Sequence, residues 1–276
     1  MNGDTLWLHG LSVIAPGLPD WAHAAAVLRG EQAWAQAPSV LPPAEALPAA
    51  ERRRASRTVR VALALGLHAL QGHDPSEIAT VFTSSGADGH NCHALCEQLA
   101  GEDRAISPTR FHNSVHNAAA GYWGIATRSM APSQVLCAYD ASFGAGWIDA
   151  LGQLRCDGGE LLLVAYDSEY PEPLRACRPV PDAAGAAFWL GTERREHSLG
   201  TLRTTLVPDA PDAMALAGLD ALRADFPALR CLPLLERIAR RDERPVVIDY
   251  LAPQRLRVQF TPADHDHPRP HPARAA

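Results

Sequence analysis

The sequence predicts an α/β fold in which helices flank a sheet, and three observations support this. Apolar segments of strand length alternate along the chain with segments of helical period, which is the pattern of a layered α/β protein. Glu160–Tyr166 (ELLLVAY) is a continuous apolar run and the clearest buried strand. Ala49–Gln71 repeats apolar residues at helical spacing, as a helix with one buried face does.

Turn and capping residues separate these elements. Pro16-Gly17 closes the first strand, Leu6–Ala15, and the Pro/Ala-rich connector Pro38–Pro48 precedes the long helix. Ser107-Pro108 is a good helix start, and that helix is expected to run through Ala118–Ala126. The other expected elements are helices over Trp21–Trp34, Asn91–Leu99, Ser142–Leu154, Ala213–Asp225 and Leu232–Arg240, and strands over Ile78–Ser84, Val135–Ala138, Phe188–Gly191, Leu202–Val207, Pro245–Leu251 and Leu256–Phe260.

Charge and composition exclude several classes of function. The net charge is −6, which argues against nucleic acid or an anionic membrane as the main partner. All 25 basic residues are arginine, so a Schiff base, a P-loop lysine and a lysine general base are excluded. Six cysteines in a chain of 276 residues do not indicate a disulfide framework.

The chain shows no targeting or membrane signal. Met1–Gly17 lacks a basic start and a long apolar core, so no signal peptide is expected. The longest apolar runs are too short to cross a bilayer. We therefore expect a cytoplasmic protein with reduced thiols and no cofactor.

Three segments stand in an order that resembles the N-terminal half of a β-ketoacyl synthase. Arg52–Leu70 begins with arginines and continues as an Ala/Leu-rich helix (RRRASRTVRVALALGLHAL). Ser107–Thr127 reads SPTRFHNSVHNAAAGYWGIAT, and Val135–Leu151 reads VLCAYDASFGAGWIDAL ahead of the strand Glu160–Tyr166. Ser114–Ala118 (SVHNA) is closer still to short ketosynthase-like proteins of aryl-polyene and xanthomonadin-type pigment pathways, which are described as chain-length factors.

This resemblance implies a thiolase-like mixed sheet flanked by helices, present only as its N-terminal half. It covers about residues 1–210. Residues 211–260 are expected to be a C-terminal extension packed on that domain, and residues 261–276 a disordered tail rich in Pro, His and Arg. A half-fold that lacks its pseudo-symmetric partner exposes an apolar face, so we expect another chain to cover it.

The resemblance also implies that no catalytic residue is present. Condensation needs a thiolate that accepts the acyl chain and two imidazoles, which the family carries in its C-terminal half. Asp140-Ala141-Ser142 falls where the family has Cys-Ala-Ser, and the family's lysine is absent. Established chain-length factors have glutamine at this position, so Asp140 departs from that pattern too. After Asp140 the chain offers only four histidines, none in a family motif: His197, His265, His267 and His271.

We therefore expect a pseudoenzyme of the chain-length-factor type that forms a heterodimer with an active ketosynthase. Contact with an acyl carrier protein is a second expected interaction, for which Arg52–Arg54 is a candidate surface. Asp140 is expected either to cap a helix or to line a pocket. The candidate interface or acyl-cavity residues are Phe111, His112, His116, Asn117, Tyr122, Trp123, Ser142 and Phe143. The aromatic residues of this set suit a protein core or the neighbour's acyl tunnel equally.

Other chemistries remain as alternatives. The chain could be a stand-alone acyltransferase or hydrolase that uses Asp140 or Ser142, and Ser142, His116 and Asp140 together suggest a triad without its usual motif. His90–Cys96 contains H-x-C-H-x-x-C, which matches no zinc module, so we expect no metal site. Cys137 alternates with Val135 and is interpreted as a thiol in the core.

Overall fold

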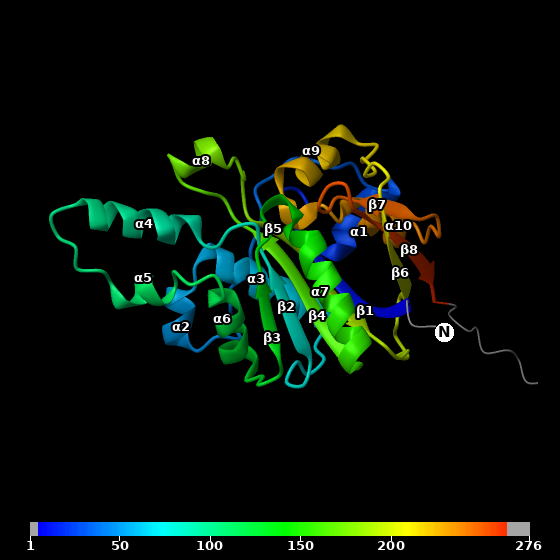
Figure 1. The fold of residues 1–276 in the computed structure, drawn as a ribbon, viewed down its shortest axis with the longest axis horizontal. Helices are drawn as coiled ribbons and strands as arrows, with labels where there is room; N and C mark the ends of the chain where they lie inside the picture. The colour runs from blue at the N-terminus through cyan, green and yellow to red at the C-terminus, as the bar shows by residue number, and fades with distance from the viewer. Residues whose placement is uncertain (1–4, 264–276) are drawn as a thin grey trace, which may run out of the picture.

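One eight-stranded sheet organises residues 5–263, the part of the chain that the computed structural model describes. The strand order is β3-β2-β4-β5-β1-β6-β8-β7 (Figure 1). Strands β3, β2 and β4 are parallel, and every other neighbouring pair is antiparallel. The strands are β1 (Thr5–Ile14), β2 (Ala79–Thr83), β3 (Ser133–Leu136), β4 (Glu160–Asp167), β5 (Ala184–Gly191), β6 (Gly200–Val207), β7 (Val246–Ile248) and β8 (Arg255–Pro262). The predicted mixed sheet is therefore confirmed.

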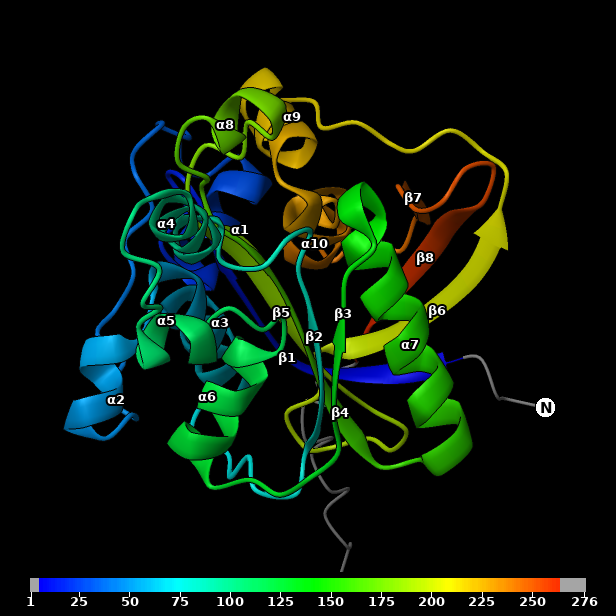
Figure 2. The same cartoon turned by 60° about the vertical axis from the view of Figure 1, so that its left-hand side comes forward.

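Helices cover both faces of this sheet (Figure 2). On one face α3 packs against β1, β4 and β5, and α6 packs on α3. On the other face lie α7, α1, α10 and the short helix η2. The helices are α1 (Trp21–Arg29), α2 (Ala49–Arg54), α3 (Arg57–Leu70), α4 (Gly89–Ala100), α5 (Pro108–His112), α6 (Ala118–Thr127), α7 (Ser142–Asp157), α8 (Leu174–Cys177), α9 (Ala217–Asp225) and α10 (Leu232–Ala239), with the 3-10 turns η1 (Tyr139–Ala141) and η2 (Pro227–Leu229).

Strand β4 explains why the fold has two cores. Seven of its eight residues are buried, so the strand is covered on both faces. Successive side chains of a strand point to opposite faces. Accordingly Leu161 and Leu163 belong to the cluster under α7 and α10, whereas Leu162 and Val164 belong to the cluster under α3 and α6. The continuous apolar run that predicted a buried strand serves both clusters.

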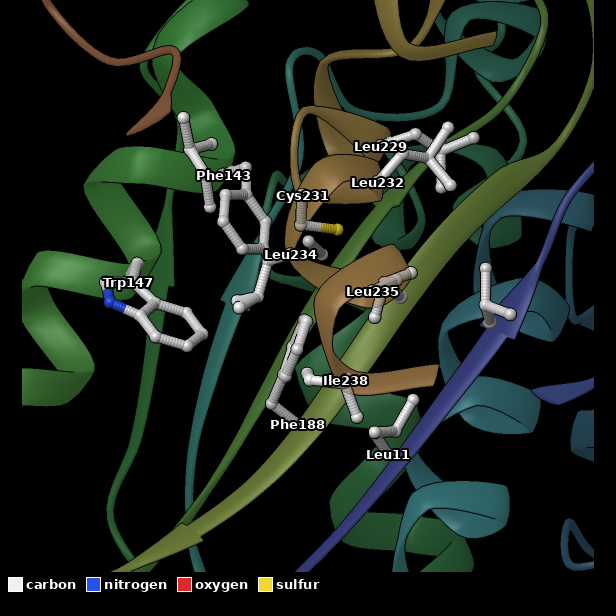
Figure 3. Close-up of a cluster of buried hydrophobic side chains, with 14 of the residues drawn as sticks. Leu11, Phe143, Trp147, Phe188, Leu229, Cys231, Leu232, Leu234, Leu235 and Ile238 are labelled. Carbon is white, nitrogen blue, oxygen red and sulfur yellow. The ribbon is translucent and has the colours of Figure 1, made fainter. Parts of the chain in front are cut away.

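The C-terminal segment covers one face of the sheet. Figure 3 shows side chains of α10 next to Phe143 and Trp147 of α7 and Phe188 of β5. The Phe188 ring is tilted against Phe143 and packs edge-on against Trp147, at centroid distances of 5.9 and 5.3 Å. The apolar side chains on this side of the sheet are therefore covered by residues of the same chain. The residues of η2 and α10 in this cluster are Ala228, Leu229, Leu232, Leu234, Leu235, Ile238 and Ala239.

Two expected helices are each broken in the structure. The helix expected over Ala49–Gln71 is two helices, because Ala55 is extended and the Ser56 hydroxyl accepts the N–H of Val59 to begin α3. The helix expected from Ser107 to Ala126 ends at His112 and begins again at Ala118. Asn113 lies in this gap, where its side chain is buried and bonds to Arg54 and Tyr122.

Smaller differences concern the ends of elements. Gly30 adopts a φ of 79° and ends α1 at Arg29 rather than at the expected Trp34. The tail was expected to begin at residue 261, but Thr261 and Pro262 pair with Thr201 and Gly200 at the end of β8, so that boundary is wrong. The rest of the expected tail, residues 264–276, lies outside the described residues. None of the helices between residues 5 and 263 is both long and apolar enough to cross a membrane.

Candidate functional site

The chain turns sharply between β3 and α7, and we call residues 138–142 the elbow. Tyr139 has a φ of 52°, in the left-handed region, which costs a residue with a Cβ about 1 kcal/mol. Ser142 stabilises this turn through its hydroxyl. The hydroxyl accepts a hydrogen bond from the Ala138 N–H at 3.0 Å and donates one to the Tyr139 carbonyl oxygen at 2.7 Å. The hydroxyl also lies 3.2 Å from the carbonyl oxygen of Ser84. The elbow therefore holds a strained turn at the start of a buried helix.

Asp140 projects from the elbow and is bound by one arginine. Nη1 of Arg178 donates to the Asp140 carboxylate at 2.6 Å, and the Arg178 guanidinium stacks over the Tyr139 ring at 3.7 Å from its centroid. The Asp140 side chain is 53% exposed. No side chain caps α7, so the expectation that Asp140 caps a helix is wrong. Instead, the charge of the Asp140 carboxylate is neutralised by Arg178, which lies outside α7.

The Arg178 guanidinium uses only some of its hydrogen-bond donors. Its Nε and Nη2 atoms are buried and have no hydrogen-bond partner among the described residues. The pKa of Arg178 is raised even though burial acts to lower it, because Asp140 accepts its hydrogen bond. Arg178 is thus permanently charged and held at the elbow by Asp140 and the Tyr139 ring.

Asp167 lies at the end of β4 and was not predicted as a site residue. Its carboxylate accepts the N–H of Ser85 at 2.8 Å, the Ser85 hydroxyl at 2.6 Å and the N–H of Ala228 at 2.9 Å. Burial raises the pKa of this carboxyl, while the bonds from Ser85 and Ala228 oppose the shift. Asp167 thereby ties the loop after β2 to η2, beside the elbow.

A cavity of about 380 Å³ opens beside the elbow, and we call it the elbow cavity. Tyr139 and Arg178 form one wall, and Tyr170 and Leu174 form another. Tyr170 packs so closely on Gly86 and Gly89 that a Cβ at either glycine would lie within 2 Å of its ring or hydroxyl. Two thiols, Cys92 and Cys177, also line the cavity. Burial raises the pKa of Cys92, so its nucleophilic thiolate is disfavoured.

The triad that the sequence suggested is not assembled. The Ser142 hydroxyl is bound to backbone groups of the elbow, and Asp140 is bound to Arg178. Nε2 of His116 is buried without a hydrogen-bond partner among the described residues, and burial lowers the pKa of this imidazole. These three side chains therefore do not form a relay that would activate a nucleophile.

The cysteines and histidines of α4 do not gather into a metal site. Nε2 of His93 lies 3.3 Å from the Glu97 carboxylate, and His90 faces Glu169 at 4.0 Å. Within residues 5–263, no group of three or more Cys, His, Asp or Glu side chains is arranged to hold a metal ion. Cys137 is exposed, and its thiol lies 3.3 Å from the Ser85 carbonyl oxygen. The interpretation of Cys137 as a core thiol is therefore wrong, because the short strand β3 ends before it.

The residues expected at an interface or an acyl cavity differ in their exposure to solvent. Three of them are exposed, namely Phe111, His112 and Asn117, and His116 is half-buried. The side chains that lie in the core are Tyr122, Trp123, Ser142 and Phe143. A Cβ at Gly66 would lie 2.5 Å from the Trp123 ring, so α6 and α3 approach closely at that point.

Helices α5 and α6 and the loops beside them carry exposed apolar side chains, and α6 packs against β3 at the edge of the sheet. Four of them, which we call the edge patch, lie on α5, α6 and the loops beside them: Phe111, Val115, Ile125 and Met130. Phe111 is 66% exposed and Met130 is 95% exposed. In Figure 1, α6 lies beside β3, which is the edge strand of the sheet. A strand edge with free backbone groups beside apolar side chains is a ready surface for another chain.

A family model for the N-terminal domain of β-ketoacyl synthase matches residues 21–215. No curated protein sequence matches the chain significantly. One similar solved structure is a chain from the complex of the ketosynthase ApeO with its chain length factor ApeC, from Xenorhabdus doucetiae. It has a TM-score of 0.71 and 23% identity, over 92% of this chain and 99% of that one.

Two further structures show the same fold at lower identity. A chain of the ishigamide ketosynthase/chain length factor has a TM-score of 0.65 and 14% identity, over 93% of this chain and 99% of that one. Ketosynthase twelve of the bacillaene polyketide synthase of Bacillus amyloliquefaciens has a TM-score of 0.54 and 12% identity, over 78% of this chain and 47% of that one. This chain thus spans nearly the whole of the first two chains but about half of the third.

Proposed function

Because the chain belongs to the β-ketoacyl synthase family through the N-terminal domain that residues 21–215 match, we propose that it is a non-catalytic subunit of the chain-length-factor type. It pairs with an active β-ketoacyl-ACP synthase in chain elongation of the polyene or fatty-acid type. The observation that carries this proposal is the elbow. At the turn where the family's nucleophile is expected, Asp140 is bound by Arg178 and no thiol is present.

The chemistry of condensation supports a non-catalytic role. A carboxylate is a poor acyl acceptor, and an anhydride formed on Asp140 would hydrolyse readily. Between Asp140 and the end of the described residues the sequence holds one histidine, His197, which is exposed between β5 and β6. No imidazole from this part of the chain reaches the elbow to stabilise an enolate.

The surface of the chain supports pairing. The edge patch and the free edge of β3 together offer apolar side chains and backbone groups to a partner. Two structures of the same fold are described as a ketosynthase with its chain length factor, and this chain spans nearly all of the chain that it matches in each. Such a subunit works in the cytoplasm, where acyl carrier proteins deliver their chains.

The second candidate is a stand-alone enzyme that processes acyl thioesters with Asp140 or Ser142. The contacts of the elbow disfavour it, because the Ser142 hydroxyl bonds to backbone groups and Asp140 is neutralised by Arg178. This candidate predicts thioester turnover by the chain alone, abolished by Asp140→Ala or Ser142→Ala. The pairing function predicts no turnover by the chain alone and activity after mixing with a ketosynthase.

Co-expression with a ketosynthase tests the proposal. The two chains are expected to co-elute in size-exclusion chromatography. Met130→Arg places a charge in the edge patch and should abolish co-elution without changing the melting temperature. Leu251→Arg is the matched control, because Leu251 is 63% exposed on a loop between β7 and β8 and should leave co-elution intact. If no ketosynthase co-elutes with the unaltered chain, the proposal is wrong.

Control of product length is a more specific proposal than pairing with a ketosynthase. Phe111 is the best residue to test, because it is exposed and its truncation should not disturb the core. Phe111→Ala should lengthen the products of the mixed complex if the ring limits a tunnel in the partner. Substitutions at Tyr122 or Trp123 need a stability measurement beside them, because both side chains are buried. If all three variants give products of unchanged length, the chain does not control product length.

A further inference from the structure

We propose that the proline- and arginine-rich segment Pro268–Arg274 of this chain docks in a groove beside Trp34. The groove has a volume of about 380 Å³ and lies where the segment between α1 and α2 passes α9. Its apolar walls include Trp34, Pro38, Pro181 and Leu222, and we call it the tryptophan groove. This inference does not depend on the proposed function, because the groove and its occupant both belong to this chain.

The indole ring of Trp34 is held in one place at the groove. Its Nε1 donates a hydrogen bond to the Pro16 carbonyl oxygen at 3.2 Å. A Cβ at Gly218 would lie 2.2 Å from the ring, so α9 approaches the indole closely at this glycine. The Trp34 side chain is half-buried and therefore keeps some exposed surface. Grooves lined by aromatic rings bind proline-rich segments, which are stiff and lose little conformational entropy on docking.

The backbone at the groove has hydrogen-bonding groups that are not used. Gln36 and Ala37 line the groove and belong to no helix or strand. Their backbone N–H and carbonyl groups make no hydrogen bond among the described residues. An extended proline-rich segment has no internal hydrogen bonds, so its carbonyl oxygens can accept from these N–H groups.

The charge of the groove favours a basic occupant. Among the described residues two carboxylates line it, Asp182 and Asp225, and no arginine does. Asp182 is already bound to Arg57 and accepts the N–H of Ser39 at 2.7 Å. Asp225 is exposed at the end of α9 and makes no hydrogen bond or ion pair within residues 5–263. An unpaired carboxylate near an aromatic ring favours a guanidinium, which can bond to the one and stack on the other.

The same chain carries a segment with the matching composition. Residues 268–274 read PRPHPAR, in which prolines alternate with other residues and two arginines are present. Prolines favour an extended backbone, and arginine supplies the guanidinium. In the docked state Arg274 pairs with Asp225, and the prolines before it pack against Trp34.

This segment is long enough to reach the tryptophan groove. It follows Ala263, whose carbonyl oxygen accepts a hydrogen bond from Arg241 just after α10. Helix α10 packs against α1, which leads back to the turn at Pro16 (Figure 2). The length of α1 is about 14 Å, whereas residues 264–276 can extend over about 40 Å. The path along α1 to the groove therefore lies within the reach of Arg274.

Protection from trypsin tests the docking on the full chain. Trypsin cleaves the bond after Arg274, and mass spectrometry detects the loss of Ala275-Ala276. The rate of this cleavage is compared with that of a free peptide of residues 264–276. The full chain should be cleaved at least about tenfold more slowly, because docking worth about 1.4 kcal/mol leaves a tenth of the segments free. Equal rates for the chain and the peptide overturn the proposal.

Substitutions of Asp225 then assign the protection to the tryptophan groove. Asp225→Asn should raise the cleavage rate toward that of the peptide, whereas Asp225→Glu should keep the protection. Asp225 is exposed, so neither variant should change the melting temperature. Asp157→Asn is the matched control, because Asp157 is exposed at the end of α7 and does not line the groove. If Asp225→Asn is protected as well as the unaltered chain, the proposal is wrong.

Two further comparisons test the occupant. The double variant Pro270→Ala, Pro272→Ala changes only the segment and should lose most of the protection, measured against a peptide with the same substitutions. Docking within one chain also predicts protection that does not depend on protein concentration. Protection that falls on dilution would mean that a second copy supplies the segment, and this result overturns docking within one chain. Full protection of the proline variant would overturn the role of the prolines and with it the proposed occupant.

Discussion

Asp167 joins three parts of the chain through one buried carboxylate. It ends β4, accepts two hydrogen bonds from Ser85 after β2, and accepts a third from Ala228 in η2. The donors lie 82 and 61 residues away in sequence. Two of them are backbone N–H groups, which are costly to leave unpaired when buried. The carboxylate thus fixes the loops around the elbow relative to the sheet.

Replacing Asp167 should therefore be costly. Asp167→Ala leaves the N–H groups of Ser85 and Ala228 without acceptors and should lower the free energy of unfolding by about 3 kcal/mol. Urea denaturation followed by circular dichroism measures this change. Asp157→Ala, at the exposed end of α7, is the matched control and should cost under about 0.5 kcal/mol. Equal midpoints for the two variants would contradict the role of Asp167.

His9 is a second buried polar residue, and it titrates far from its usual range. Burial lowers its pKa to about 4, although the Glu160 carboxylate acts to raise it. Arg195 and His73 act in the same direction as burial. Nδ1 of His9 lies 3.0 Å from the Ser198 hydroxyl, and the ring packs edge-on against Trp189. The folded chain therefore holds His9 as a neutral imidazole.

Stability should fall in acid because of His9. The unfolded chain takes up a proton on His9 near pH 6.5, whereas the folded chain does so only near pH 4. The contribution is complete above pH 6.5 and is lost between pH 6.5 and 4, by up to about 3 kcal/mol. His9→Gln should flatten the slope of unfolding free energy against pH over this interval. His68→Gln, at an exposed position, should keep the slope. An unchanged slope in the His9 variant would contradict the assignment.

The sequence indicated Asp140 and the elbow but not the residues around them. The segment Val135–Leu151 placed a turn and a buried helix in succession, and both are present. Arg178 and Asp167 gave no signal, because their partners lie 38 to 82 residues away and meet them only after the loops fold. Spacing along the chain identifies local geometry, whereas long-range pairs depend on tertiary structure.

Among the elements, helices were easier to predict than their ends. The apolar period of Arg57–Leu70 and the capping hydroxyl of Ser56 identify α3, but Ala49–Arg54 also consists of helix-forming residues, so one continuous helix was expected. Asn113 interrupts the next helix by bonding to Arg54 and to Tyr122. Both breaks are caused by side-chain hydrogen bonds, which compete with the helix backbone and leave the apolar pattern unchanged.

Helix α10 should contribute strongly to stability. It buries six of its eight residues, and Leu235 is fully buried. Leu235→Ala should lower the free energy of unfolding by about 3 kcal/mol, because it removes apolar contact and leaves a cavity. Leu206→Ala is the control, since Leu206 is 54% exposed on β6. Thermal unfolding of the two variants measures the difference, and a similar cost for both would contradict the packing.

At the scale of the molecule, residues after 210 complete the fold rather than extend it. They add β7 and β8 to the sheet, place η2 against β4, β5 and α7, and place α10 against α1, β7 and β8. A chain that ends at residue 210 should therefore lack a cooperative unfolding transition and aggregate, because one face of the sheet loses its cover. Calorimetry of this truncated chain tests the point. A single sharp transition would show that residues 1–210 form an independent domain, as the boundaries drawn from the sequence imply.

The central position of β1 constrains how the chain folds. Strand β1 lies between β5 and β6, so Thr5–Ile14 pairs with residues 185–191 and 200–203. During synthesis this strand emerges before its partners, which follow some 170 residues later. Contacts between such distant segments are slow to form, because a long loop must close before any of them is made. The sheet cannot be completed on the ribosome until most of the chain has emerged, and refolding should be slow.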